Sequence, residues 1–262
     1  MRLAFSTLAC PEWTLDRIVR AASDYGYEGV ELRVLDGELL TPSLPADRRG
    51  HVRSTLQHAE LALCCVDTSY EIANPDHDLS EALAYVELAA DLGGPMIRLF
   101  AGAPRREAAA KTARRTVDRL ARLADVGRGL GVSIGVETHD SFATGAAMFA
   151  MLRDAPPDVG VIWDTLNSLV AGEAPETTFP LVASRLVHVH VKDGGLPPDP
   201  ERNLLFGEGR VPLVSILRTL SANAYDGWLS VEWEKLWQPS IPGPEIALPR
   251  YAQALRETLT SL

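Results

Sequence analysis

The stretch VSIGVETHDSFATGAAMFAMLRDAPPDVGVIWD, residues 132–164, has the pattern of a strand, a helix and a second strand. The apolar runs Val132–Glu137 and Val159–Trp163 have the length and composition of buried strands. Between them, Ser141–Arg153 has apolar residues at helical spacing. Two strands joined by a helix of this length lie parallel in one sheet, with the helix on its face.

The same alternation extends in both directions from this stretch. We predict further strands at Leu3–Ser6, Gly29–Arg33, Leu61–Val66, Pro95–Phe100, Leu186–Val191 and Trp228–Glu232. We predict helices at Thr14–Tyr25, Ala46–Ala59, Leu79–Leu92, Glu107–Leu130, Val214–Asn223 and Glu245–Leu262, and helical turns over 165–184 broken at Pro175.

Eight strand–helix units in 262 residues suit a closed (β/α)8 barrel, which typically needs roughly 250 residues. No linker or change of composition divides the chain, so we expect one TIM-barrel domain over residues 1–262. The competing α/β architecture is an open, doubly wound sheet that binds a dinucleotide. No GxGxxG motif follows the first predicted strand, which argues against it.

Composition excludes several classes of protein. Lys and Arg number 25 against 35 Asp and Glu, a net charge of −10, which disfavours nucleic acid and anionic membranes as partners. No window approaches the roughly 18 apolar residues of a transmembrane helix, and the apolar part of residues 1–10 is too short for a signal peptide. We therefore expect a cytoplasmic protein. The three cysteines (Cys10, Cys64, Cys65) include no CxxC pair, which argues against a disulfide framework. We expect Cys64 and Cys65, which lie in the apolar run 61–66, to be buried thiols.

Ionisable residues lie at four successive strand ends in the second half of the chain. They are Glu137, Asp164, His190 and Glu232. In a TIM barrel the carboxyl ends of the strands form the active-site face, so these side chains should converge. Three carboxylates at close range repel one another unless a cation lies between them. Oxygen ligands with one imidazole suit one divalent ion, Mn²⁺, Mg²⁺ or Co²⁺, and are also compatible with Zn²⁺.

Seven stretches carry a family resemblance. They are YGYEGVELR (25–33), IRLFAG (97–102), GVETH (135–139), WDTLN (163–167), HVHVKD (188–193), GEGRVP (207–212) and YDGWLSVEWEK (225–235). Together they resemble the sugar phosphate isomerase/epimerase family with a xylose-isomerase-like TIM barrel. That family is related to ketose 3-epimerases, inosose dehydratases and, more distantly, endonuclease IV. The resemblance implies that Glu137, Asp164, His190 and Glu232 bind one divalent metal.

The implied activity is isomerisation or epimerisation of a sugar by removal of a proton next to a carbonyl. The metal would stabilise the enediolate as a Lewis acid. Glu137 and Glu232 would act as the catalytic acid–base pair on opposite faces of the substrate.

Six further residues are candidate substrate contacts: Glu31, Arg98, His139, Asn167, His188 and Lys192. Four of them have a structural alternative. Glu31 and Arg98 would form an ion pair inside the barrel, Lys192 would pair with Asp193, and His188 would fill the interior. Family members commonly carry a histidine where this chain has Asn167. The basic run Arg105, Arg106, Lys111, Arg114 and Arg115 is expected to be a solvated helix face.

Other functions stay open. A keto-sugar or inosose-type dehydratase would use the same site to expel a hydroxyl group. More remote are a DNA-repair enzyme resembling endonuclease IV and a non-catalytic sugar-binding barrel. The expected partner is a small sugar or cyclitol, and a homo-oligomer is compatible with the sequence.

Overall fold

Eight parallel strands form a closed barrel in the computed structural model, which describes residues 1–102, 108–198 and 202–262. The strands are β1 (Arg2–Ser6), β2 (Gly29–Leu32), β5 (Ala62–Glu71), β6 (Met96–Phe100), β7 (Ser133–Glu137), β8 (Val159–Asp164), β9 (Leu186–Val191) and β12 (Trp228–Val231). Their order around the barrel follows the chain, and β12 closes it against β1. The predicted (β/α)8 fold is confirmed.

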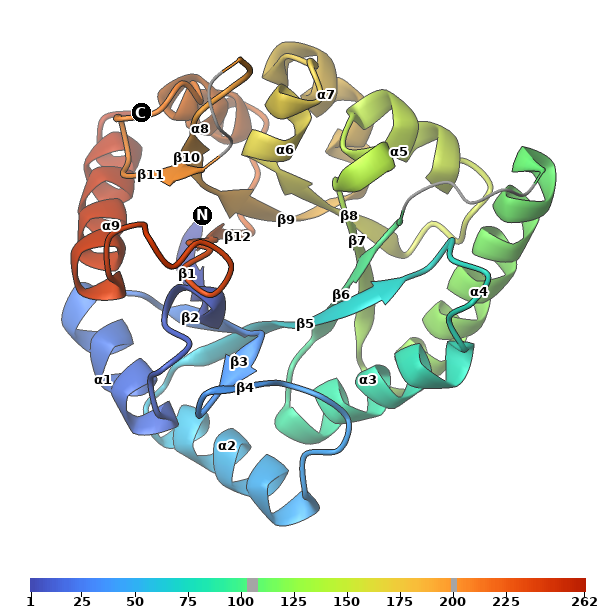
Figure 1. The fold of residues 1–262 in the computed structure, drawn as a ribbon, viewed down its shortest axis with the longest axis horizontal. Coiled ribbons are helices and arrows are strands. Elements are labelled where there is room, and N and C mark those ends of the chain that lie inside the picture. The colour runs from blue at the N-terminus through green and yellow to red at the C-terminus, as the bar shows by residue number, and fades with distance from the viewer. Residues whose placement is uncertain (103–107, 199–201) are drawn as a thin grey trace.

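Helices surround the barrel (Figure 1). They are α1 (Leu15–Tyr25), α2 (Ala46–His58), α3 (Leu79–Leu92), α4 (Ala109–Leu130), α5 (Gly145–Leu152), α6 (Thr165–Val170), α7 (Pro175–Val182), α8 (Leu213–Ala222) and α9 (Pro244–Thr260). The short 3-10 helices are Thr7–Ala9, Asp140–Phe142 and Ala183–Arg185. The predicted first residue of the fourth helix, Glu107, lies outside the described residues, as do Arg105 and Arg106.

Two small hairpins, not predicted from the sequence, lie beyond strand ends at the carboxyl-terminal face. They are β3 (Val34–Leu35) with β4 (Glu38–Leu39), and β10 (Asp193–Gly194) with β11 (Asn203–Leu204). Strands of two residues are too short to show alternation of apolar and polar residues, so they cannot be predicted from periodicity. Both hairpins add structure beside the barrel mouth, by which we mean the carboxyl-terminal end of the eight strands.

The apolar core lies mainly between the barrel and its helices. Inside the barrel, two small groups fill the lower part: Ala4, Cys64 and Trp228, and Cys65, Met96 and Ile162. Gly135 lies beside them, and a Cβ there would be 2.7 Å from Ile162 Cδ1. A larger residue would therefore push β7 away from its neighbours. All three cysteines are buried and unpaired, as predicted for Cys64 and Cys65.

Candidate active site

The strand ends bring Glu137, Asp164, His190 and Glu232 together, although the residues are far apart in the sequence. One ligand atom from each lies within 4.8 Å of the others. His190 Nδ1 is 3.3 Å from Glu137 Oε1 and 3.6 Å from Glu232 Oε1. All four side chains are buried. The barrel therefore assembles the four residues selected from the sequence into one compact group.

Asp164 ends β8 and also begins α6. Its Oδ1 accepts hydrogen bonds from the backbone N–H groups of Leu166 (2.9 Å) and Asn167 (2.7 Å), which caps the helix. Oδ2 is buried and forms an ion pair with Lys192 Nζ, 2.8 Å away. Burial, reinforced by the carboxylates of Glu232 and Glu137, raises the pKa of Asp164 to about 7. A divalent cation beside Oδ2 would stabilise the ionised form of Asp164 more than the single charge of Lys192 does.

Glu137 is held by Arg98 from the neighbouring strand β6. Arg98 Nη1 donates to Glu137 Oε2 at 2.7 Å, and Arg98 Nε lies 3.5 Å from Asp67 Oδ1. Burial opposes ionisation of Glu137, but Arg98 and His190 outweigh it and hold its pKa below the usual range. Glu137 is therefore a carboxylate at neutral pH. The alternative ion pair between Glu31 and Arg98 does not form.

Glu31 instead joins the two histidines of β9. Its Oε1 lies 2.9 Å from His190 Nε2, and its Oε2 lies 3.1 Å from His188 Nε2. His190 therefore turns Nε2 toward Glu31 and Nδ1 toward Glu137 and Glu232. Burial opposes charge on His190, but the carboxylates of Glu31, Glu232 and Glu137 raise its pKa well above the usual value. Glu31 thus orients the imidazole, as metal-bound histidines generally require.

Lys192 forms ion pairs with three carboxylates instead of the expected local pair with Asp193. Nζ lies 2.8 Å from Asp164 Oδ2, 2.8 Å from Glu232 Oε2 and 2.5 Å from Glu234 Oε1. Asp193 instead accepts backbone N–H groups from Gly194, Gly207, Gly209 and Val211, which fixes the loop after β9.

His139 and Asn167 lie near the rim of the mouth. The partly exposed His139 ring packs on Phe100 with centroids 4.3 Å apart, and its Nδ1 is 2.9 Å from Asp140 Oδ2. Asn167 uses its side-chain amide to donate to the Thr138 carbonyl at 3.1 Å. His188 is fully buried and lies two residues before His190 on β9. Direct contact of these residues with substrate stays a prediction.

The donor set fits a divalent cation. Three carboxylates and one imidazole lie close together, with one ligand atom from each within 4.8 Å of the others. Two other groups combine Glu31 with a cysteine: Glu31, Cys64 and His188, and Glu31, Cys65 and Asp67. Burial raises the pKa of both thiols well above the usual value, and metals bind the thiolate. These two groups therefore suit a metal less well.

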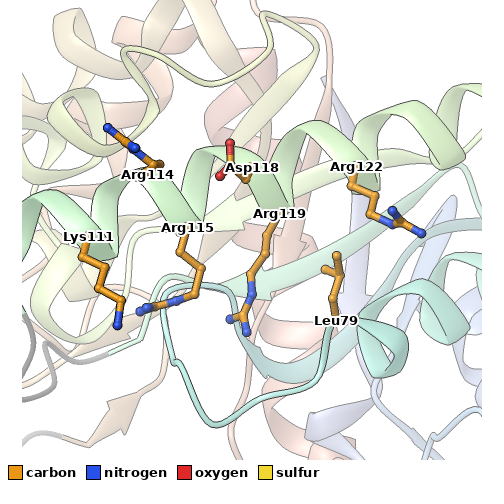
Figure 2. Close-up of a pocket in the computed structure, with 7 residues that line it drawn as sticks. All are labelled: Leu79, Lys111, Arg114, Arg115, Asp118, Arg119 and Arg122. Atoms are coloured by element: carbon orange, nitrogen blue, oxygen red, sulfur yellow. The ribbon is translucent and has the colours of Figure 1, made fainter.

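A basic groove of about 540 Å³ lies on the outer side of the barrel, along α4 (Figure 2). Arg115 donates to the Ala73 carbonyl at 2.6 Å. Arg119 donates to the carbonyls of Ile72 (3.0 Å), Asn74 (2.6 Å) and His77 (2.6 Å). Two arginines of the groove therefore anchor the β5–α3 connection, which is a structural role.

Three charged residues at the mouth were not selected from the sequence: Arg33, Asp67 and Glu234. Asp67 directly follows the predicted third strand, and Arg33 is two residues beyond Glu31. The rule that selected Asp164, a charged residue at a strand end, applies equally to both. Burial and the nearby Glu31 raise the pKa of Asp67 well above its usual range.

Residues 19–258 match the family described as xylose isomerase-like TIM barrel, so the chain belongs to this family. An inosose dehydratase from Lacticaseibacillus casei is 28% identical over 134 residues, which cover 44% of this chain and 45% of that protein. The match thus spans less than half the length of this relative.

Within the described residues, we find no helix with the length and apolar character needed to span a bilayer.

Two solved structures show the same fold. The IOLI protein, with a binding zinc atom, aligns at a TM-score of 0.83 with 16% identity, covering 100% of this chain and 99% of that chain. L-ribulose 3-epimerase aligns at a TM-score of 0.80 with 16% identity, covering 99% and 95%. The chain therefore shares the fold of these two proteins over nearly its whole length.

Proposed function

We propose that this protein is a divalent-metal-dependent isomerase or epimerase of a small sugar or cyclitol. The observation that carries the proposal is the convergence of Glu137, Asp164, His190 and Glu232, with one ligand atom from each within 4.8 Å of the others. The zinc atom in the structure of the similar IOLI protein supports a bound divalent metal. The proposed ion is Mn²⁺, Mg²⁺, Co²⁺ or Zn²⁺.

The bound ion would supply Lewis-acid polarisation of a substrate carbonyl. The chain's own carboxylates would move the proton. Glu137 is ionised because of Arg98 and accepts a proton from the carbon next to the carbonyl. Glu232 reaches the group from β12, on the far side of β8 and β9 from Glu137. It is therefore placed to return a proton from another direction.

A dehydratase on the same site is the second candidate, and the inosose dehydratase relative favours it. Both reactions begin by removing the same kind of proton. They differ in the second step, because a dehydratase expels a hydroxyl group and an isomerase returns a proton to carbon. The product's mass distinguishes them.

The test uses the Mn²⁺-loaded protein in D₂O with a panel of ketoses and keto-inositols, analysed by mass spectrometry. An isomerase or epimerase places deuterium on carbon in a product of otherwise unchanged formula, whereas a dehydratase gives a product that lacks one water. We expect Glu137→Gln to keep the fold and lose deuterium incorporation by at least about 100-fold.

Glu176→Gln, an exposed position on α7, serves as the control. Unchanged deuterium incorporation in Glu137→Gln would remove Glu137 from the proton-transfer role. A wild-type protein that binds none of the four ions would refute the metal-dependent function.

A further inference from the structure

Arg33 is a buried arginine with no carboxylate partner among the residues that the structure describes. It follows β2 directly and is 4% exposed. Its Nη2 donates to Ser69 Oγ, and its backbone N–H donates to Thr7 Oγ1 at 2.9 Å. Arg98, by contrast, lies beside two carboxylates. A buried charge with no opposite charge in contact is costly. An anion that binds beside Arg33 would offset this cost.

The side chain of Arg33 lies on the mouth side of the barrel. Arg33 is two residues beyond Glu31, whose carboxylate points inward to His190, and alternate residues of a strand face the same way. Ser69 is two residues beyond Asp67, which points inward to Arg98. Ser69 is exposed, so solvent reaches this part of the mouth. Arg33 and Ser69 thus form a pair of donors at the mouth, on the β2–β5 side of the barrel.

The guanidinium of Arg33 has N–H groups left for an anion, although the mouth as a whole holds more buried carboxylates than cations. Burial and the positive charge of nearby Arg98 lower the pKa of Arg33 from its usual value, and the negative charges of Asp67 and Glu232, which form no ion pair with Arg33, only partly offset this shift. A guanidinium has five N–H donors in a planar fork, and Ser69 is the one side-chain acceptor that Arg33 has within the described ranges. A carboxylate would accept two of the remaining N–H groups side by side.

We propose that Arg33, together with the Ser69 hydroxyl, binds a carboxylate group of the substrate. This proposal rests on the proposed function and narrows its substrate class to sugar acids or carboxylated cyclic polyols. One unpaired cation matches the single charge of a carboxylate. A phosphate monoester carries a charge of roughly −1.5 to −2, and the other buried cations of the mouth, Arg98 and Lys192, already lie against carboxylates.

The test compares D-gluconate with D-glucitol, which differ at one end by a carboxylate and a neutral hydroxymethyl group. Binding is measured by calorimetry with metal-free protein in EDTA and again with Mn²⁺-loaded protein. We expect wild type to bind gluconate at least about tenfold more tightly than glucitol in both forms. Arg33→Gln should lose this preference, and Arg33→Lys should keep part of it because a point charge lacks the planar fork.

Arg153→Gln, an exposed position beside Asp154, is the matched control and should retain the preference. Equal binding of the two probes by metal-free wild type, or an unchanged preference in Arg33→Gln, would overturn the proposal. D-glucose 6-phosphate is a third probe. If it binds more tightly than gluconate and this binding depends on Arg33, the site prefers a phosphate and the carboxylate assignment is wrong.

Mn²⁺ titration of the same proteins tests the metal dependence of the proposed function separately from the carboxylate site. Arg33→Gln should bind Mn²⁺ as wild type does, because Arg33 contacts none of the four candidate ligands. A wild type that binds no metal but prefers gluconate through Arg33 would refute the metal-dependent reaction and retain the anion site.

Discussion

Single residues at the barrel mouth carry an excess of buried negative charge. Five carboxylates and three cations are buried there: Glu31, Asp67, Glu137, Asp164 and Glu232 against Arg33, Arg98 and Lys192. Three minus five leaves −2 before the histidines are counted. The raised pKa values of Asp67, Asp164 and His190 are the expected response to this excess. A divalent cation would balance the charge without added protons.

Lys192→Met tests how much of this balance one ammonium provides. The change leaves Asp164, Glu232 and Glu234 without their buried cation. We expect the metal-free protein to lose about 3 kcal/mol of unfolding free energy. Mn²⁺ should bind about tenfold more tightly because Lys192 no longer repels it. Urea unfolding in EDTA and Mn²⁺ titration measure the two effects.

Lys192→Arg retains the positive charge, so its Mn²⁺ affinity should not increase. Wild-type stability together with wild-type Mn²⁺ affinity in Lys192→Met would contradict the electrostatic role assigned to Lys192.

The four candidate metal ligands could be found from the sequence because each is a charged residue at the end of an apolar run. The pairing of the remaining charges could not. Arg98 could pair with Glu31, Asp67 or Glu137 by position alone, and the distances between strands decide that it lies against the last two. Arg33 lies at a predicted strand end and could have been selected by the same rule, but only the structure reveals that it has no carboxylate partner among the described residues.

A bulge in strand β5 determines which of its charged side chains point into the barrel. The register against β2 shifts so that Val30 is opposite Leu63 and Glu31 is opposite Cys65. Cys64 and Cys65 consequently both contact interior side chains, and Asp67 points inward where strict alternation would turn it outward. Alternation read from the sequence cannot locate such an extra residue.

Helix α4 supports β5 from outside, and Arg119→Ala tests this support. Arg119 donates to the carbonyls of Ile72, Asn74 and His77, which follow β5. Loss of these three hydrogen bonds should cost about 2–3 kcal/mol of unfolding free energy. Arg114→Ala, an exposed arginine of the same groove, should cost less than about 0.5 kcal/mol. Urea denaturation compares them, and equal losses would argue against the anchoring role.

For the whole molecule, eight apolar runs were enough to predict the closed barrel because each parallel strand is buried on both faces. The predicted helix boundaries differ from the structure where a cap decides them. Helix α5 begins at Gly145 rather than Ser141 because the Thr144 hydroxyl accepts from the Ala147 N–H at 3.1 Å. That the whole chain is one domain and acts in the cytoplasm stays a prediction.

The charge excess at the mouth predicts how the stability of the whole molecule depends on pH. The folded-state pKa of Asp164 is about 7 against an ordinary value of 3.8, so the folded protein binds more protons than the unfolded chain between these values. Stability must then fall as pH rises through this range, by up to about 4 kcal/mol from Asp164. His190, with its raised pKa, acts in the same direction above its usual value.

In EDTA, the melting temperature should therefore decrease between about pH 5 and about pH 8. Mn²⁺ should reverse this loss, because the ion replaces the protons. Asp164→Asn, which keeps a cap oxygen for α6, should flatten the slope in EDTA because the amide does not titrate. A melting temperature that rises with pH in EDTA, or an equal slope in Asp164→Asn, would show that the buried carboxylates are balanced without a metal.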